Sequence, residues 1–235
     1  MVIRDLKTND DFAECIALQE ATWGEGFSER VPSAILRVGQ LIGGVSAGAF
    51  DDADRMVGFV FGLTGVRDGE LVHWSDMLAV KRELRSQGIG ERLKQYQREK
   101  VVAIGVTAML WTFDPLQAGN AHFNINRLGA MPIEYVPNMY GANTGSALHG
   151  ALPTDRFIVR WDLQAVPVRA IGGSVHVEIP PDFNAEQRAS RERALDWRVR
   201  VREAMVKHLA DGYHVVGFHR GTSGNPFYIL EREDS

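Results

Sequence analysis

The chain has few of the residues that cross-link or anchor a fold. Cys15 is its one cysteine in 235 residues, which excludes an intramolecular disulfide framework and a zinc site built on cysteines. No apolar run reaches the ~18 residues of a membrane-spanning helix, and the start, Met1-Val2-Ile3-Arg4-Asp5, becomes charged at once, unlike a secretion signal. We therefore expect a cytoplasmic protein with no membrane partner and with Cys15 buried as an inert thiol.

A large charge excess is also missing. The 26 Lys and Arg residues stand against 30 Asp and Glu, and the net charge of −4 predicts no overall attraction for nucleic acid. With 45% apolar residues and about 150 residues per typical domain, the length fits one domain with an extension. The segment 164–174 is rich in Pro and Gly and predicts a linker, which gives domains at 1–165 and 166–235.

Two chemical motifs can be weighed and set aside. The stretch Gly44-Val45-Ser46-Ala47-Gly48 matches the nucleophile elbow of serine hydrolases, but that elbow needs a helix after the serine, and here an acidic turn and a second strand follow. The seven histidines are scattered, and the closest pair, His214 and His219, falls five apart on an expected strand. We expect neither a serine hydrolase nor a metal site.

The order of apolar patterns and turn residues predicts an α/β protein. Its sheet is expected to be mixed and mostly antiparallel, flanked by helices, with a small β-α-β-β extension at the C-terminus. The expected strands are 2–6, 41–50, 56–66, 70–80, 109–113, 133–136, 157–163 and 175–179, followed by a hairpin over 213–230. The expected helices are 8–23, a short one opening at Pro32, 91–100, one capped by Asn120, and 184–210.

The last of these helices has an apolar face made by Ala194, Trp197, Val201, Met205 and Leu209. That face must dock on something. We expect either a homodimer contact or a lid over an acceptor site.

The most informative feature is a strand that ends in a glycine turn and opens a helix. Leu78-Ala79-Val80 leads into Arg85-Ser86-Gln87-Gly88-Ile89-Gly90 and then into the helix. The first-turn N–H groups of a helix lack partners within it and carry about half a positive charge, so this corner is suited to a pyrophosphate. The phosphate loop of nucleoside triphosphatases is disfavoured because no Lys-Ser or Lys-Thr follows the glycines. A dinucleotide-binding fingerprint is also disfavoured, because it needs a small residue at the position of Leu93.

With these residues the chain resembles the GNAT superfamily of N-acyltransferases, whose acyl-CoA signature is R/Q-x-x-G-x-G/A. The stretch Trp111-Thr112-Phe113-Asp114-Pro115-Leu116, with Asn120-Ala121 and Gly129 after it, is similar to a bacterial GNAT subgroup that has a C-terminal extension. The resemblance covers residues 1–163 and implies a GNAT fold. It also implies acetyl-CoA, or another acyl-CoA, as co-substrate, no metal, and a small-molecule or peptide amine as acceptor.

The resemblance also implies roles for individual residues. Arg85 and the amides of Ser86, Gln87, Gly88, Ile89 and Gly90 would hold the pyrophosphate, while Leu78, Ala79 and Val80 would pair with the pantetheine arm. Leu78 would also polarise the thioester carbonyl, Asp76 would act as base, and Asn120 and Phe123 would line the thiol end. Glu25 and Glu29 would attract a cationic amine.

The chain departs from the family at Ile125, where a tyrosine usually serves as general acid. Asn124, Tyr135, Tyr140 or a water could replace it, or the thiolate could leave unaided, as its pKa of about 8.5 permits. The departure keeps a second hypothesis open, an acyl-CoA-binding or regulatory module with little turnover. A third, nucleotide-dependent phosphotransfer, predicts that ATP binds more tightly than CoA.

Overall fold

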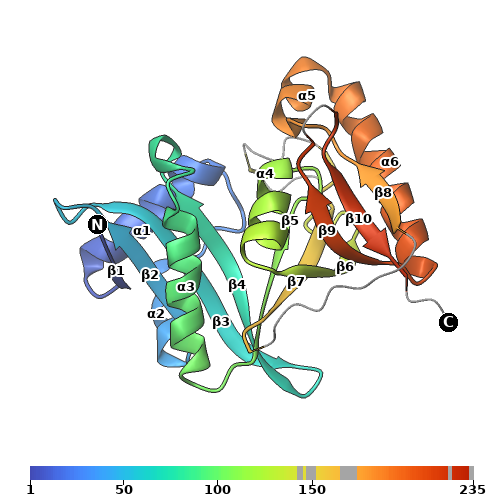
Figure 1. Ribbon diagram of the computed structural model, residues 1–235. Helices are drawn as coiled ribbons and strands as arrows, with labels where there is room; N and C mark the ends of the chain where they lie inside the picture. The colour runs from blue at the N-terminus through green and yellow to red at the C-terminus, as the bar shows by residue number, and fades with distance from the viewer. Residues whose placement is uncertain (142–144, 147–151, 165–173, 222–223, 233–235) are drawn as a thin grey trace. The chain divides into compact units, whose positions relative to one another are not determined.

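The computed structural model of the chain describes residues 1–141, 145–146, 152–164, 174–221 and 224–232 (Figure 1). Its contacts divide into two compact units. The first contains Met1–Trp111 and Asp162–Gln164, and the second contains Thr112–Ala142 and most of the chain after residue 151. This division falls inside a strand near the middle of the chain. Residues 165–173 of the predicted linker lie outside the described residues, so the boundary at 165 stays a prediction.

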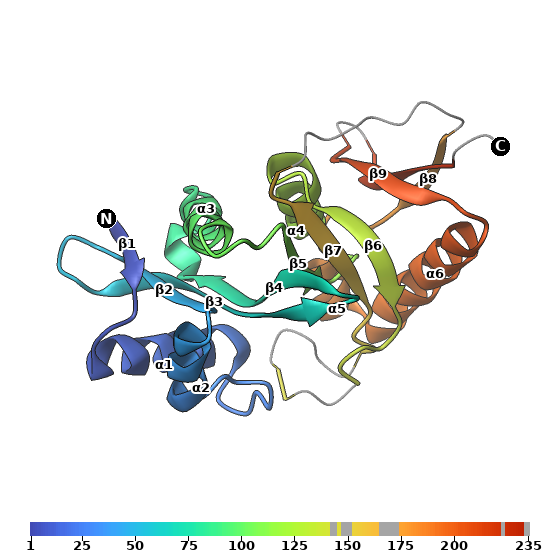
Figure 2. The ribbon, with the colours of Figure 1, turned by 90° about the horizontal axis from the view of Figure 1, so that it is seen from below.

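The first unit is an α/β layer structure, as predicted. Its strands are β1 (Val2–Asp5), β2 (Val45–Phe50), β3 (Met56–Arg67), β4 (Glu70–Val80) and β5 (Ala108–Phe113), and its helices are α1 (Asn9–Trp23), α2 (Ser33–Leu41) and α3 (Ile89–Val102), with a short 3₁₀ turn at Arg82–Leu84. Neighbouring strands pair antiparallel, except that β4 and β5 are parallel. Helices α1 and α2 cover one face of the sheet and α3 the other (Figure 2).

The start of α1 shows how the sequence determines this unit locally. Thr8 accepts a hydrogen bond from the Asp11 amide, and the Asp11 side chain accepts from the Thr8 amide, which is a capping box. Beyond the cap, Phe12 and Cys15 pack into a core with Phe59 of β3. Burial raises the pKa of the Cys15 thiol to about 12, which confirms the prediction of a buried, inert thiol.

The stretch 41–50, which contains the elbow-like motif, is a strand only in its second half. The expected strand 41–50 begins only at Val45, because α2 continues to Leu41 and the chain then turns through Gly43, whose φ of 86° favours glycine. Ser46 of the elbow-like motif is the second residue of β2, fully buried, and its hydroxyl donates to the carbonyl of Leu36 at 2.7 Å. The expectation of a plain strand at this motif is confirmed.

The second unit contains the remaining elements. They are α4 (Ala118–Ala121) with a π-helical turn (His122–Arg127), the antiparallel pair β6 (Met131–Val136) and β7 (Arg156–Asp162), and then β8 (Ser174–Glu178), α5 (Phe183–Ala189), α6 (Arg191–Ala210), β9 (His214–His219) and β10 (Phe227–Glu231). Strands β8, β10 and β9 form a separate antiparallel sheet in that order, whereas the strand order of the large sheet is β1-β2-β3-β4-β5-β7-β6. The large, mostly antiparallel sheet with flanking helices is the predicted architecture.

Two helix predictions in this unit are wrong in detail. Asn120 does not cap a helix, because it lies inside α4, which starts after Gln117 without a side-chain cap. The single helix expected over 184–210 is two helices, since Ser190 adopts an extended φ of −161° and its hydroxyl accepts from the Arg193 amide to start α6.

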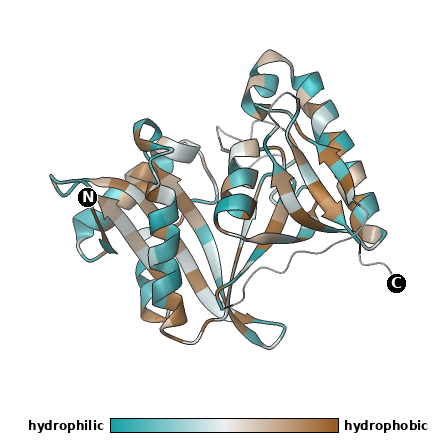
Figure 3. Cartoon of the chain, in the orientation of Figure 1, coloured by the Kyte–Doolittle hydropathy of each residue, from teal (hydrophilic) through white to brown (hydrophobic). Residues whose placement is uncertain are grey.

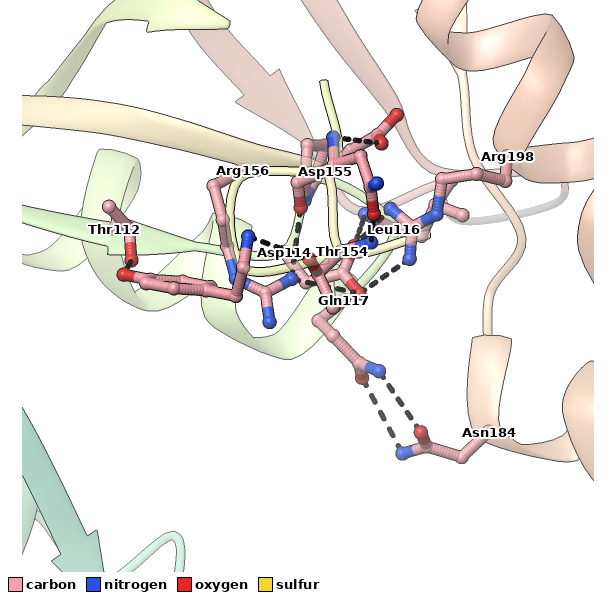
Figure 4. Close-up of polar contacts among 12 residues, drawn as sticks. Thr112, Asp114, Leu116, Gln117, Thr154, Asp155, Arg156, Asn184 and Arg198 are labelled. Carbon is pink, nitrogen blue, oxygen red and sulfur yellow. Dashed lines mark hydrogen bonds and ion pairs between the residues drawn. The ribbon is translucent and has the colours of Figure 1, made fainter. Parts of the chain in front are cut away.

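Helix α6 docks within the second unit through its predicted apolar face, of which Ala194, Val201 and Met205 are buried. Much of the remaining helix surface is hydrophilic (Figure 3). Arg198 also lies on this buried face, and its guanidinium donates to both oxygens of Asp114 at 2.7 Å, a partner that the sequence did not indicate (Figure 4). The extension is therefore tied to the Asp114-Pro115 turn after β5. A dimer or lid role for it stays a prediction.

Candidate functional site

Strands β4 and β5 stay paired over only a short distance. Their parallel register joins Val72 to Ala108 and ends where Trp74 meets Leu110, whereas β4 continues to Val80. On its other edge β4 remains paired with β3 as far as Val80. The part of β4 from Ser75 to Val80 therefore has one edge that β5 does not use.

The register shows which main-chain groups point to this edge. The Lys81 amide donates to the Val57 carbonyl at 2.9 Å, so every second residue back from Lys81 exchanges hydrogen bonds with β3. The N–H and C=O groups of Leu78 and Val80 consequently point to the edge that faces away from β3. At that edge the Val80 carbonyl accepts from Nε of Arg85 at 3.2 Å.

The strand–turn–helix corner has the predicted geometry. Ser86 and Gly88 adopt positive φ angles of 63° and 79°, and α3 begins at Ile89 with the Gly88 carbonyl accepting from the Arg92 amide at 3.0 Å. The first-turn amides from Ile89 onward have no carbonyl partner within the helix. A Cβ added at Gly88 would meet no atom within 4 Å, so its glycine is needed for the backbone angle and not for packing. The corner brings Arg85, the turn amides and Val80 together.

Asp76 lies at a β-bulge in β4, where the register with β3 shifts so that Ser75 and Asp76 lie opposite Gly62. Its side chain is exposed, and desolvation of the carboxyl, followed by repulsion from Glu29, raises its pKa. A hydrogen bond from the Trp74 side chain to the carboxylate lowers this pKa and offsets part of the shift. Glu29 lies in the loop between α1 and α2.

A buried polar chain between β4 and α3 was missed by sequence reasoning. Lys94 donates to the Ser75 hydroxyl at 2.8 Å, and that hydroxyl donates to the Gln97 side-chain oxygen at 2.7 Å. The Gln97 amide nitrogen contacts Nε2 of His73 at 2.9 Å, and Nδ1 of His73 lies 3.0 Å from the Thr64 hydroxyl. The spacing of Lys94 and Gln97 could have indicated their burial, because it places both on the same helix face as Leu93 and its apolar neighbours.

Residues assigned to the thiol end belong to the second unit. Asn120 is exposed, Phe123 is half-buried in the π-helical turn, and Ile125 is buried. The Tyr135 hydroxyl donates to Asp155 at 2.7 Å, and burial raises its pKa further above that of a free tyrosine, which makes it a poor proton donor. Tyr140 shares a 3.1 Å contact with the Thr112 hydroxyl.

Among the described residues, no group of three or more His, Cys, Asp or Glu side chains is placed to hold a metal ion. In the same part of the chain, no helix is both long enough and apolar enough to cross a bilayer.

No family model matches the chain, and no curated protein matches it. Solved structures do. An aminoglycoside 6'-acetyltransferase type Ii is 18% identical with a TM-score of 0.55, over 71% of this chain and all of the other. An acetyltransferase of the GNAT family from Streptococcus pneumoniae is 16% identical with a TM-score of 0.53, over 68% of this chain and 96% of the other. A putative acetyltransferase from Salmonella typhimurium, solved with its cofactor acetyl-CoA, is 15% identical with a TM-score of 0.53, over 72% of this chain and 98% of the other. At these identities the likeness concerns the fold, and the chain has the fold of the GNAT acetyltransferases.

Proposed function

We propose that the chain is an acyl-CoA-dependent N-acyltransferase that moves an acetyl or other short acyl group to an amine, either a small molecule or a peptide. One observation carries the proposal. The edge of β4 left open beyond Trp74 leads directly to the glycine turn and the start of α3. A carrier with a pyrophosphate at one end and an amide-containing arm at the other fits such a combination of anion site and strand edge.

In this proposal the main chain provides most of the binding. Arg85 and the amides from Ser86 to Gly90 neutralise the pyrophosphate, which requires Arg85 to leave the Val80 carbonyl. The pantetheine amides then pair with Val80 and Leu78 as an added strand would. The Leu78 amide polarises the thioester carbonyl, as one donor of an oxyanion hole.

Asp76 acts as the base in the proposed reaction. An amine with a pKa near 10 arrives protonated at neutral pH and must lose a proton before it attacks the thioester. The raised pKa of Asp76 makes it a better base than a free aspartate, and the charge of Glu29, which acts on Asp76, favours a cationic acceptor. The CoA thiolate leaves as an anion and is protonated by water. Ile125 has no ionisable proton to give, and the Tyr135 hydroxyl donates its proton in a hydrogen bond to Asp155.

The test compares two glycines with matched backbone strain. Gly88 and Gly69 have φ angles of 79° and 82°, and neither has an atom within 4 Å of an added Cβ, but Gly69 lies in the β3–β4 turn at the far end of β4. Gly88→Ala should weaken acetyl-CoA binding by about tenfold or more in calorimetry and slow the release of free thiol with an amine panel, since the phosphate-facing turn must distort. Gly69→Ala should carry the same strain and leave binding unchanged.

The alternatives predict other results. Tight CoA binding with no thiol release from any amine would indicate a binding or regulatory module. ATP binding stronger than CoA binding would indicate phosphotransfer. If turnover occurs, Asp76→Asn should abolish most of it while preserving CoA affinity, and equal turnover in that variant would remove Asp76 from the mechanism.

A further inference from the structure

Lys94 is a buried amine with no anion beside it. Only 2% of its surface is exposed, its Nζ donates to the Ser75 hydroxyl at 2.8 Å, and the same nitrogen lies 3.6 Å from the centre of the Trp111 ring. Of the Asp and Glu residues that the structure describes, none forms an ion pair with Lys94. Burying an unpaired charge is costly, and an apolar side chain of the same length would fill this place more cheaply.

The hydrogen bonds next to Lys94 have one consistent direction. The Thr64 hydroxyl donates to the Gly43 carbonyl, so His73 must donate to Thr64 from Nδ1 and accept from Gln97 at Nε2. Ser75 donates to Gln97 and accepts from Lys94. The chain is complete with His73 uncharged, since burial, followed by the nearness of Lys94, lowers the pKa of His73 to about 3, and burial also lowers the pKa of Lys94.

The amine lies where β4 and β5 separate. Ser75 is the first residue of β4 after the last paired residue, Trp74, and Trp111 is the first residue of β5 after its partner Leu110. Lys94 contacts both Ser75 and Trp111. It therefore marks the closed end of the open β4 edge, whose other end is the glycine turn after Val80.

The length of an acyl-CoA arm can be compared with the length of β4 between Val80 and Ser75, the residue that Lys94 contacts. From phosphorus to sulfur the pantetheine arm has about thirteen bonds, the length of roughly four extended residues. An arm that starts beside Val80 thus brings its sulfur close to Asp76. An acyl chain of about four carbons adds between one and two residue lengths, and its far end then reaches Ser75 and Lys94.

We infer that Lys94 selects acyl-CoA esters whose acyl group ends in a carboxylate, of the four-carbon succinyl type. The inference rests on the proposed function and names its acyl donor. The carboxylate supplies the anion that Lys94 lacks among the described Asp and Glu residues, and pairing with it favours the charged form of Lys94. A neutral acyl group of the same length offers Lys94 no anion and gains nothing from it. His73 in the polar chain and Asp76 next along β4 are the other titratable groups around this point.

The experiment compares succinyl-CoA with butyryl-CoA, which has the same number of acyl carbons but no charge. Calorimetry should show that the wild-type chain binds succinyl-CoA about 10- to 100-fold more tightly. Comparison of two buffers of different ionisation enthalpy should show a net uptake of protons, because pairing raises the lowered pKa of Lys94. Lys94→Met should remove both the preference and the proton uptake and leave butyryl-CoA binding unchanged. Lys100→Met is the control, since Lys100 lies on the same helix and forms an exposed pair with Asp5.

The outcomes separate the two proposals. Equal binding of the two esters by the wild-type chain, or a preference that survives Lys94→Met, overturns the role of Lys94 without touching CoA binding. Failure of succinyl-CoA, butyryl-CoA and acetyl-CoA alike to bind overturns the proposed function itself. If Lys94→Met does not fold, Lys94→Gln, which keeps a hydrogen bond to Ser75 but no charge, should lose the same preference, and its retention counts against the inference.

Discussion

Replacing Asp114 by Asn tests how the C-terminal extension is held. Asp114 accepts two hydrogen bonds from Arg198 at 2.7 Å, and Arg156 lies 3.7 Å away (Figure 4). The side chains of Arg198, Arg156 and Asp114 are only 3%, 7% and 15% exposed. The Nε of Arg198 already has no hydrogen-bond partner, so the substitution leaves the buried Arg198 guanidinium without its ion pair to Asp114.

Breaking one side of a buried ion pair typically costs about 3–5 kcal/mol, and we expect Asp114→Asn to destabilise the second unit by about that amount. The control is Asp196→Asn on the same helix, whose pair with Arg200 is 3.1 Å long and more than half exposed. A surface pair of this kind should cost about 1 kcal/mol or less. The assay is urea unfolding monitored by tryptophan fluorescence, in which Trp197 of α6 reports on the second unit. If the two units unfold in separate transitions, each transition is fitted by itself.

The pH dependence gives a second check on the same pair. Desolvation acts to raise the pKa of Asp114, but the charge and hydrogen bonds of Arg198 outweigh it, and the pKa is lowered. A lowered folded pKa stabilises the fold above the unfolded value near 4 and loses that stabilisation as the pH falls further. The difference between wild type and Asp114→Asn should therefore shrink below about pH 4. A cost under about 1 kcal/mol at pH 7, or one equal to that of Asp196→Asn, would refute the reasoning.

Three further results are expected. Gly62→Ala should destabilise the first unit by about 1–3 kcal/mol in urea unfolding, because an added Cβ would lie 2.3 Å from Nε2 of His73. Gly65→Ala on the same strand is the control and should be nearly neutral, because an added Cβ there meets no atom within 4 Å. Equal costs for the two variants would contradict the packing around Gly62. Because the pKa of Asp76 is raised, the acid limb of the rate–pH profile should lie above pH 4 and disappear in Asp76→Asn, and an unchanged limb would assign it to another group. Thr8→Ala should cost about 1 kcal/mol by removing the cap of α1, and a thermal midpoint identical to wild type would show that the cap contributes nothing.

The sequence by itself determined the local features of this protein. Residue types with fixed backbone preferences made the glycine turn at Gly88 and the helix after it predictable, and the strand periods gave β3, β4 and the class of the fold. The boundaries were less secure. Ser190 divides the long C-terminal helix through its own extended backbone, and Asn120 lies inside α4 where it was expected to cap it, because capping residues compete with helix formation in a way that depends on the surrounding chain.

Only the tertiary structure decided which polar groups became buried together. The spacing of Lys94 places it on the apolar face of α3, but it does not specify Ser75 as its partner, and only the packing of α3 on β4 joins the two where β5 diverges. In the same way Arg198, on the apolar face of α6, reaches Asp114 more than eighty residues before it, and the helical period does not specify that partner. Periodicity reports which face of an element is apolar, whereas the partner of a buried charge depends on long-range packing, which a single sequence does not specify.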